Sequence, residues 1–130
     1  MKRTFTLILT SLLSLLTWAQ SPSKMSYQAV IRNASNNLIT NQTIGIQISI
    51  LQGGINGPSV YTETQTATTN GNGLLSIVIG EGNTSDNFST IDWSDGPFFV
   101  KTETDPTGGT NYTITGTSQL LSVPYALHAN

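Results

Sequence analysis

The chain has no cysteine, a single histidine and few charged residues. Of its 130 residues only 9% are charged. Without cysteine no disulfide framework can form, so stability has to come from ordinary packing. Five Lys and Arg residues oppose seven Asp and Glu residues, which gives a formal net charge of −2. A chain with so few, scattered cations has no basic stripe, and we expect neither nucleic acid nor an anionic membrane surface as a partner.

Convergent catalytic or metal-binding side chains are also scarce. A zinc site needs several His or Cys ligands, and the one histidine, His128, lies in the C-terminal segment, where we expect a solvated tail residue. His128 would also have to serve any Ser-His-Asp triad, yet no serine stands in a G-x-S-x-G context. Glu63 and Glu103 lie on predicted strands and are expected to face solvent, and two carboxylates alone hardly indicate a glycosidase. The sequence therefore predicts a protein without enzymatic activity.

The one long apolar run lies at the N-terminus, from about residue 5 to 16, after Lys2 and Arg3 and before Thr17 and Ala19. This order of cations, apolar residues and small residues is typical of a secretory signal peptide cleaved after Ala19. The run is too short to span a bilayer comfortably, so we favour a signal peptide over a membrane anchor and expect no membrane span in the mature protein. The lack of cysteine excludes a lipoprotein signal. The N-terminus thus predicts export, and it leaves about 110 residues, enough for one domain with a modest core.

Alternation of apolar and polar residues with a period of two dominates the rest of the chain. The clearest case is the segment 44–50, where four isoleucines alternate with Gly, Gln and Ser. The Asn-Gly pairs of the segment 70–73 readily supply positive φ, so we expect 60–79 to form a β-hairpin. About seven short strands are predicted, at 26–33, 37–40, 43–51, 60–69, 74–80, 97–105 and 112–123.

These short strands, with turn signals about every 8–12 residues and no helical period after the signal peptide, predict an all-β fold. The expected architecture is an antiparallel sandwich of the immunoglobulin-like or transthyretin-like type. A signal peptide (1–19) and a short linker (20–25) precede the sandwich domain (26–123). Pro124 cannot donate to a sheet, so the last segment (124–130) is expected to leave the sandwich toward a downstream region that is missing here.

The segment 80–95, GEGNTSDNFSTIDWSD, gathers several oxygen donors of the kind that calcium takes. The calcium candidates among its carboxylates are Glu81, Asp86, Asp92 and Asp95. Their spacing does not match an EF-hand loop, and Asn, Asp and Ser are also ordinary turn formers. Apart from this calcium hypothesis, we expect no cofactor.

Trp93, in the same segment, has two interpretations. It is expected to cap one end of the core, with Phe88 and either Phe98 or Phe99 nearby. The alternative is an exposed aromatic platform for a ligand, because sugar recognition wants a flat apolar face flanked by polar groups. The two hypotheses differ in whether the indole is buried.

Three stretches of the mature chain are specific enough to suggest a family: YQAVIRN, FFVKTETDPTGG and SQLLSVPYALHA. With the sequence around them, from about residue 27 to 129, they resemble the N-terminal domain of large secreted surface proteins of Bacteroidetes-type bacteria. In those proteins the domain follows a signal peptide and precedes collagen-like, coiled-coil or tail-fibre-like segments, some of which end in an endosialidase-type chaperone domain. The resemblance provides no catalytic or binding residues. It implies that SVPYALHAN leads from the sandwich into a following stalk.

Two hypotheses for the function come from these observations. The first is a non-enzymatic, secreted structural or display module at the base of a cell-surface or extracellular fibre-like protein. Its partners would be other proteins or downstream segments of its own chain, with an oligomer formed through the missing stalk. The second is a glycan- or protein-binding module that uses the Trp93 region and the 81–95 loop. The sequence names no ligand for it.

Overall fold

The computed structural model describes residues 23–121 of the chain, and these residues form a nearly all-β structure. The six strands are β1 (Met25–Val30), β2 (Thr43–Gln52), β3 (Ser59–Thr68), β4 (Leu74–Ile79), β5 (Phe98–Asp105) and β6 (Ile114–Leu120). A single 3-10 turn, η1 (Phe88–Thr90), lies between β4 and β5. Within the range 23–121, no helix is long and apolar enough to cross a membrane. The predicted signal peptide and the exit segment lie outside the described residues.

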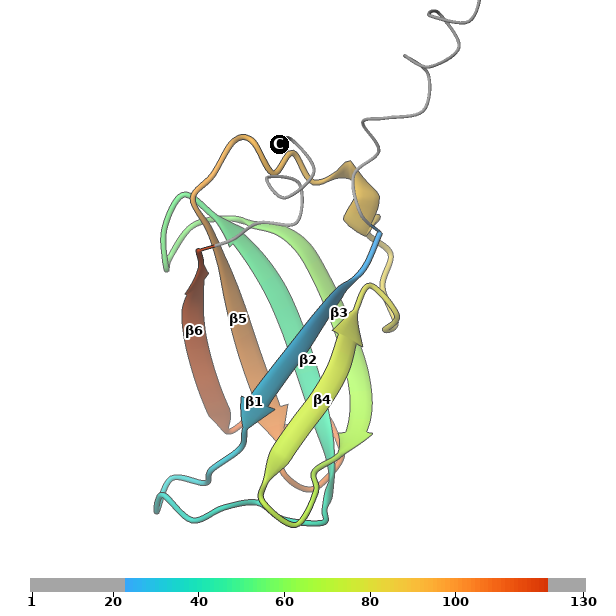
Figure 1. Cartoon of the computed structure of the whole chain (residues 1–130), viewed down its shortest axis with the longest axis vertical. Helices are drawn as coiled ribbons and strands as arrows, with labels where there is room; N and C mark the ends of the chain where they lie inside the picture. The colour runs from blue at the N-terminus through green and yellow to red at the C-terminus, as the bar shows by residue number, and fades with distance from the viewer. Residues whose placement is uncertain (1–22, 122–130) are drawn as a thin grey trace, which may run out of the picture.

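All strand pairs are antiparallel, and the strands form two sheets that face each other (Figure 1). The larger sheet has four strands in the order β3-β2-β5-β6, and the smaller one pairs β1 with β4. In Figure 1 the small sheet crosses in front of the large one. The predicted all-β antiparallel sandwich is confirmed, and the arrangement is consistent with an immunoglobulin-like fold.

Strand β2 forms the centre of the core because its isoleucines occupy every second position and therefore share one face, as the sequence predicted. Ile44, Ile46, Ile48 and Ile50 all point between the sheets and are at most 1% exposed. Burying one such side chain stabilises the fold by about 1.5–3 kcal/mol. The rest of the buried core cluster comes from β3, β4, η1, β5 and the connecting segments, and it comprises Ile31, Ile39, Tyr61, Leu75, Ile77, Ile79, Phe88, Ile91, Trp93, Phe98 and Val100. Strands β1 and β6 pack against it with partly buried side chains.

Two predictions about the strands need correction. The segment 37–40 is not a strand, because its only ladder contact is an isolated bridge between Arg32 and Leu38. The segment 60–79 is not a hairpin, because β3 and β4 belong to different sheets. The chain does turn at Asn70, where the Gly73 N–H donates to the Asn70 carbonyl at 3.0 Å. The turn leads across the sandwich, however, and β4 pairs with β1 instead.

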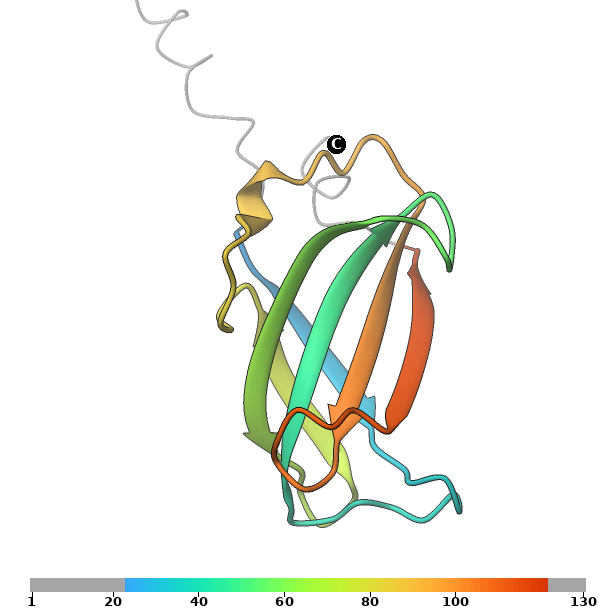
Figure 2. The same ribbon diagram turned by 180° about the vertical axis from the view of Figure 1, so that it is seen from behind.

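The connection between β5 and β6 folds back over the outer face of the large sheet, as the view from behind shows (Figure 2). Gly109 in this connection lies directly on Gly45 of β2, so closely that a Cβ at Gly45 would collide with the Gly109 carbonyl oxygen. The lack of a side chain at position 45 therefore allows the loop to cover the sheet. It also explains why Gly45, on the face opposite the isoleucines, is buried.

Candidate functional site

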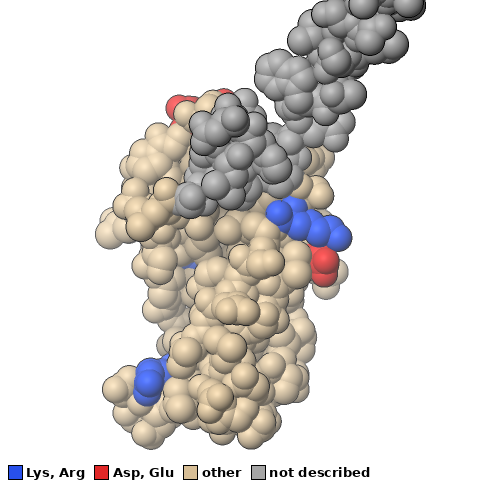
Figure 3. All heavy atoms as spheres, viewed as in Figure 1, with Lys and Arg blue, Asp and Glu red and all other residues tan. Residues whose placement is uncertain are grey.

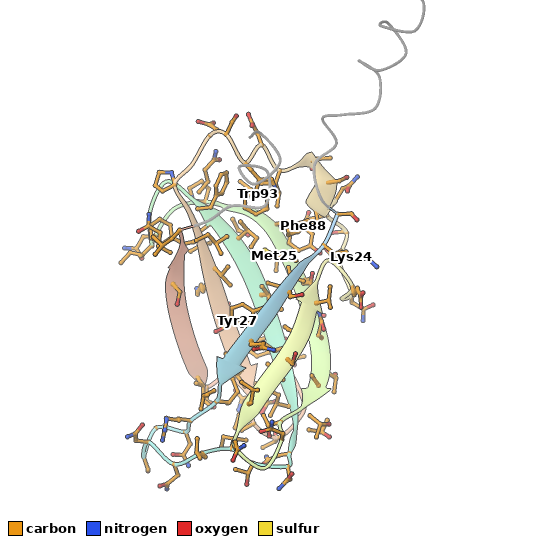
Figure 4. All side chains as sticks on the ribbon, viewed as in Figure 1. Lys24, Met25, Tyr27, Phe88 and Trp93 are labelled. Atoms are coloured by element: carbon orange, nitrogen blue, oxygen red, sulfur yellow. The ribbon has the colours of Figure 1, made fainter. Side chains whose placement is uncertain are left out.

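Trp93 lies at the end of the sandwich covered by the connection from β4 to β5 (Figure 4). Its ring centroid is 5.6 Å from that of Phe88 and 5.0 Å from that of Phe98, and Phe88 in turn meets Tyr61 edge-on at 5.2 Å. The Trp93 side chain is only 3% exposed. The predicted cap of the core is therefore observed, and the proposed ligand platform at Trp93 is wrong, because the stacked aromatic rings leave no indole face open to solvent.

The four calcium candidates do not converge. Glu81 forms an ion pair with Lys24, with 3.3 Å between Nζ and Oε1, and Asp86 accepts the backbone N–H of Thr62 at 3.0 Å. Within the segment 23–121, no group of three or more His, Cys, Asp or Glu side chains could hold a metal ion. Lys24 and Glu81 lie side by side, and other charged groups on this face are few and isolated (Figure 3).

The remaining two candidates are used in their own loop. Oδ1 of Asp92 accepts both the backbone N–H and the hydroxyl of Ser94, at 3.2 and 2.5 Å, which is an Asx turn. Oδ2 of Asp95 accepts the Gln52 side-chain amide at 3.2 Å. Each acidic side chain of the 80–95 segment thus fixes the loop or ties it to a strand.

The most buried carboxylate is one that the sequence placed on the surface. Glu63 of β3 is 1% exposed and accepts four hydrogen bonds. The Tyr61 hydroxyl (2.6 Å) and the Gly80 N–H (2.5 Å) donate to Oε1. The Gly82 N–H (3.1 Å) and the Gln65 side-chain amide donate to Oε2. The expectation that Glu63 faces solvent is wrong, because β3 turns the Tyr61 and Glu63 side chains to the same, inner face.

These contacts connect the two sheets through one carboxylate. Gly80 and Gly82 follow β4 of the small sheet, whereas Glu63 belongs to β3 of the large one. A Cβ at Gly82 would lie only 2.5 Å from Glu63 Oε2, so the close approach depends on glycine there. Burial and the hydrogen bond to Glu63 both raise the pKa of the Tyr61 phenol well above its usual value. The phenol therefore stays protonated and donates, and the carboxylate has no accessible lone pair for a ligand or a substrate.

Glu103, the second carboxylate expected to face solvent, lies on the outer face of the large sheet. Its side chain is 25% exposed and lies 3.9 Å from Lys101 Nζ. The Gln47 side-chain amide donates to it at 3.2 Å. This half-exposed ion pair agrees with the expected outward orientation. Glu63 lies opposite the buried Ile48, whereas Glu103 lies opposite Gln47 on the other face, so the sheet separates the two carboxylates and they form no pair of the glycosidase kind.

Asp105 organises the connection that covers the outer face. Its Oδ1 accepts the backbone N–H and the hydroxyl of Thr107, at 2.9 and 2.6 Å, and its Oδ2 accepts the Asn111 N–H at 3.0 Å. These hydrogen bonds lower the pKa of the Asp105 carboxyl below its usual value, and the bond from the Thr107 hydroxyl has the largest effect. Asp105 was not among the predicted site residues, although the turn sequence DPTGG, which begins with Asp105 at the end of β5, was a signal for it.

Three surface hollows remain as binding candidates. One, of about 150 Å³, lies between β3 and the β5–β6 connection, and its lining is uncharged: Thr64, Gln65, Thr66, Asn83, Gly108, Gly109, Thr110 and Tyr112. A second, of about 240 Å³, lies beside the predicted binding loop and includes Gln52, Asp92 and Asp95. The third, of about 280 Å³, lies where β1 approaches β5 and β6 and includes Tyr27, Ile114 and Ser118. All three fall below the roughly 300–1,000 Å³ of typical ligand pockets.

Comparison with known families adds one match. The family described as "Domain of unknown function (DUF8740)" matches residues 26–119. The chain belongs to this family. The DUF8740 match runs from β1 into β6, so it covers both sheets and all the sites described above. No curated protein and no solved structure matches the chain.

Proposed function

We propose that this chain is a non-enzymatic, exported structural module that displays a following segment at the cell surface or in an extracellular fibre. The observation that carries the proposal is the use of carboxylates to fix the connections at the ends of the sandwich. Glu63, Asp92 and Asp105 each accept several hydrogen bonds from neighbouring backbone or hydroxyl groups. Such contacts make the ends of the sandwich rigid, which suits a module that carries another segment in a fixed orientation.

Export and location are supported by the sequence. The first 19 residues have the layout of a signal peptide, and three stretches of the mature chain resemble domains that precede stalks and fibres in secreted surface proteins. We therefore place the module outside the cell or on its surface, with a following segment of its own chain as its first partner.

The alternative of a binding module is not supported at its proposed place. A stacking platform for a glycan needs an exposed ring, whereas Trp93 is buried against Phe88 and Phe98. The acidic residues of the 81–95 loop are engaged in turns and ion pairs. We therefore propose the display function alone.

The test is to add an epitope after Asn130 and to express the chain in a bacterium that processes its signal peptide. Three versions are compared: the full chain, Ile48→Asp and Thr66→Asp. Ile48 is 0% exposed, so a buried carboxylate there unfolds the sandwich, while Thr66 is exposed and serves as the matched control. Antibody labelling of intact cells, normalised to total epitope, measures display.

We expect strong labelling for the full chain and for Thr66→Asp, and loss of labelling for Ile48→Asp. The intact mass of the exported chain is expected to correspond to a chain that begins at Gln20. The proposal fails if Ile48→Asp displays the epitope as well as the full chain does, because the folded sandwich would then be dispensable. It also fails if the epitope stays inside the cell in all three versions.

A further inference from the structure

The two edge strands of the large sheet, β3 and β6, differ in whether other segments of the chain hydrogen-bond to their outer side. The β3 edge is closed by the segment after β4: Thr64 and Asn83 exchange backbone hydrogen bonds of 3.0 and 2.8 Å. Thr62 donates its N–H to Asp86 at 3.0 Å and accepts the Thr84 hydroxyl on its carbonyl at 2.6 Å. The backbone groups of Thr62 and Thr64 that point away from β2 are thus satisfied within the chain.

The opposite edge, β6, has no such cover among residues 23–121. No described residue pairs with the side of β6 that faces away from β5. Its seven residues, ITGTSQL, contain no charge and no proline, and its register with β5 runs without a bulge. Charges, prolines and bulges are the devices by which proteins keep an edge strand from pairing with another strand, and β6 lacks all three.

The sequence of β6 is complementary to itself in the antiparallel direction. If two copies align at Thr117, each Ile114 lies opposite Leu120 of the other copy, Thr115 opposite Gln119, and Gly116 opposite Ser118. Ile114 and Leu120 already pack against the core and are only half buried, so this alignment places apolar side chains together on the inner face. On the outer face it places Thr117 opposite Thr117 of the other copy, and Thr–Thr pairs are favourable cross-strand neighbours.

The nearest charges do not oppose this pairing. Lys101 and Glu103 of β5 lie beside Thr117 and Thr115 and form an ion pair of 3.9 Å with each other. In the aligned pair, Lys101 of one copy and Lys101 of the other are three strand spacings apart, roughly 14 Å. That separation exceeds the screening length of about 8 Å at physiological ionic strength.

We propose that β6 pairs with β6 of a second copy of this chain, antiparallel and centred on Thr117, so that the two four-stranded sheets become one continuous sheet. The inference does not depend on the display function, because it concerns the isolated chain in solution. An edge-to-edge contact of seven residues buries less than the roughly 1,200–2,000 Å² of a stable interface. The dimer is therefore concentration-dependent, with a dissociation constant on the order of 10 µM.

The experiment is sedimentation velocity of the mature full chain from about 1 to 500 µM, a range that brackets this constant. Thr117→Lys and Thr117→Glu each place like charges opposite one another across the two-fold axis. Thr117 is exposed, so neither change disturbs the core. We expect each variant alone to dimerise about 5- to 10-fold more weakly, and an equimolar mixture of the two to recover dimerisation. Thr66→Lys, an exposed position on β3, is expected to behave as the unchanged chain does.

Three results overturn the proposal. The first is a chain that stays monomeric over the whole range. The second is dimerisation that neither Thr117 variant weakens, or that their mixture does not recover, because another surface would then be used. The third is a chain ending at Leu121 that dimerises while the full chain does not, which would show that the segment 122–130 occupies the β6 edge. Unchanged Trp93 fluorescence in each variant verifies that the fold is intact.

Discussion

Glu63 is predicted to stabilise the sandwich as an anion with four donors, and two substitutions test this. Glu63→Gln keeps the shape of the side chain but replaces one acceptor oxygen with an amide group that donates. Tyr61→Phe removes the hydroxyl that donates to Oε1 at 2.6 Å and keeps the ring that meets Phe88. Each change therefore removes a hydrogen bond to the carboxylate and leaves the aromatic packing in place.

The expected magnitudes follow from the contacts. In Glu63→Gln one amide nitrogen faces the Gly82 N–H, and a buried donor without an acceptor costs about 1–3 kcal/mol. With the loss of charge-assisted bonds to Tyr61 and Gly80, we expect Glu63→Gln to lower the free energy of unfolding by about 2–4 kcal/mol. Tyr61→Phe loses one bond to a charged acceptor, which costs about 1.5–3 kcal/mol.

The two changes are expected to be coupled. Once Glu63 is replaced by Gln, the Tyr61 hydroxyl donates to a neutral acceptor, and such a bond contributes only about 0.5–1.5 kcal/mol. Tyr61→Phe should therefore cost about 1 kcal/mol less in the Glu63→Gln background than in the unchanged chain. This difference isolates the interaction between the phenol and the carboxylate from effects of either side chain alone.

Urea unfolding of a chain that begins at Gln20, followed by fluorescence, measures these free energies. Trp93 is the only tryptophan after residue 19 and lies in the core, so it reports on unfolding of the sandwich. Glu103→Gln is the matched control: its half-exposed ion pair with Lys101 is expected to contribute no more than about 0.5 kcal/mol. If Glu63→Gln costs no more than Glu103→Gln, and Tyr61→Phe costs less than about 0.5 kcal/mol, the carboxylate does not connect the sheets as described.

Three further predictions concern other positions. Gly45→Ala is expected to lower the free energy of unfolding in urea by about 1–3 kcal/mol, because the new Cβ displaces the loop at Gly109. Gly54→Ala is the control: no atom lies within 4 Å of its Cβ, so it should cost less than about 0.5 kcal/mol. Equal costs for the two variants would contradict this packing. Asp105→Asn is expected to have a lower free energy of unfolding than the unchanged chain at pH 7, and this difference should shrink as the pH falls below about 4. A carboxyl whose pKa is lowered in the folded state stabilises the fold above its unfolded pKa and loses that stabilisation when it is protonated. A difference that does not change with pH would refute this prediction. Trp93→Phe is expected to lower the free energy of unfolding, measured by circular dichroism, by less than about 1.5 kcal/mol, since it removes an indole N–H that has no acceptor among residues 23–121. Trp93→Ala should cost about 3–5 kcal/mol because it also removes the ring from the core. Similar costs for the two variants would show that the volume of the ring does not determine stability here.

The strands could be predicted because alternation is a local property of the sequence. The segment 44–50 was expected to bury its isoleucines on one face, and all four are buried between the sheets. Aromatic residues near Trp93 were expected to cap the core, and Phe88 and Phe98 do so. These predictions needed only the side-chain period of a strand and the apolar character of the residues.

The pairing of strands could not be predicted in the same way. The segment 70–73 was recognised as a turn, and Asn70 and Gly73 do form one. An Asn-Gly pair favours reversal of the chain, yet it does not determine whether the strands on either side share a sheet. Here Thr69 donates its N–H to Gln42 and Ile31 donates to Gly73, so this connection is bound to other segments and crosses between sheets.

The orientation of β3 was missed because its sequence is almost entirely polar. Val60 and Tyr61 are adjacent and point to opposite faces, so the apolar residues do not mark the inner face clearly. Tyr61 is the buried one, and Glu63 shares its face by the period of two. The register places Tyr61 opposite Ile50 and Glu63 opposite Ile48, both buried. Had Tyr61 been taken as the marker of the inner face, a buried Glu63 would have followed, together with the need for several donors to it.

The acidic and amide residues of the loops illustrate why the calcium hypothesis arose and why turn formation accounts for them better. A calcium site and an Asx turn both use the side-chain oxygen of Asn or Asp. In an Asx turn this oxygen accepts a backbone N–H two residues later, whereas calcium needs several such oxygens to converge on one ion. Among residues 23–121 an Asn or Asp accepts the backbone N–H two residues later at five positions: Asn33, Asn70, Asn87, Asp92 and Asp105. A carboxylate used so locally has little freedom to converge with others on an ion. A binding site in this chain is therefore better sought at backbone edges than among the turn residues, and β6 is an edge of the large sheet that the described fold leaves open.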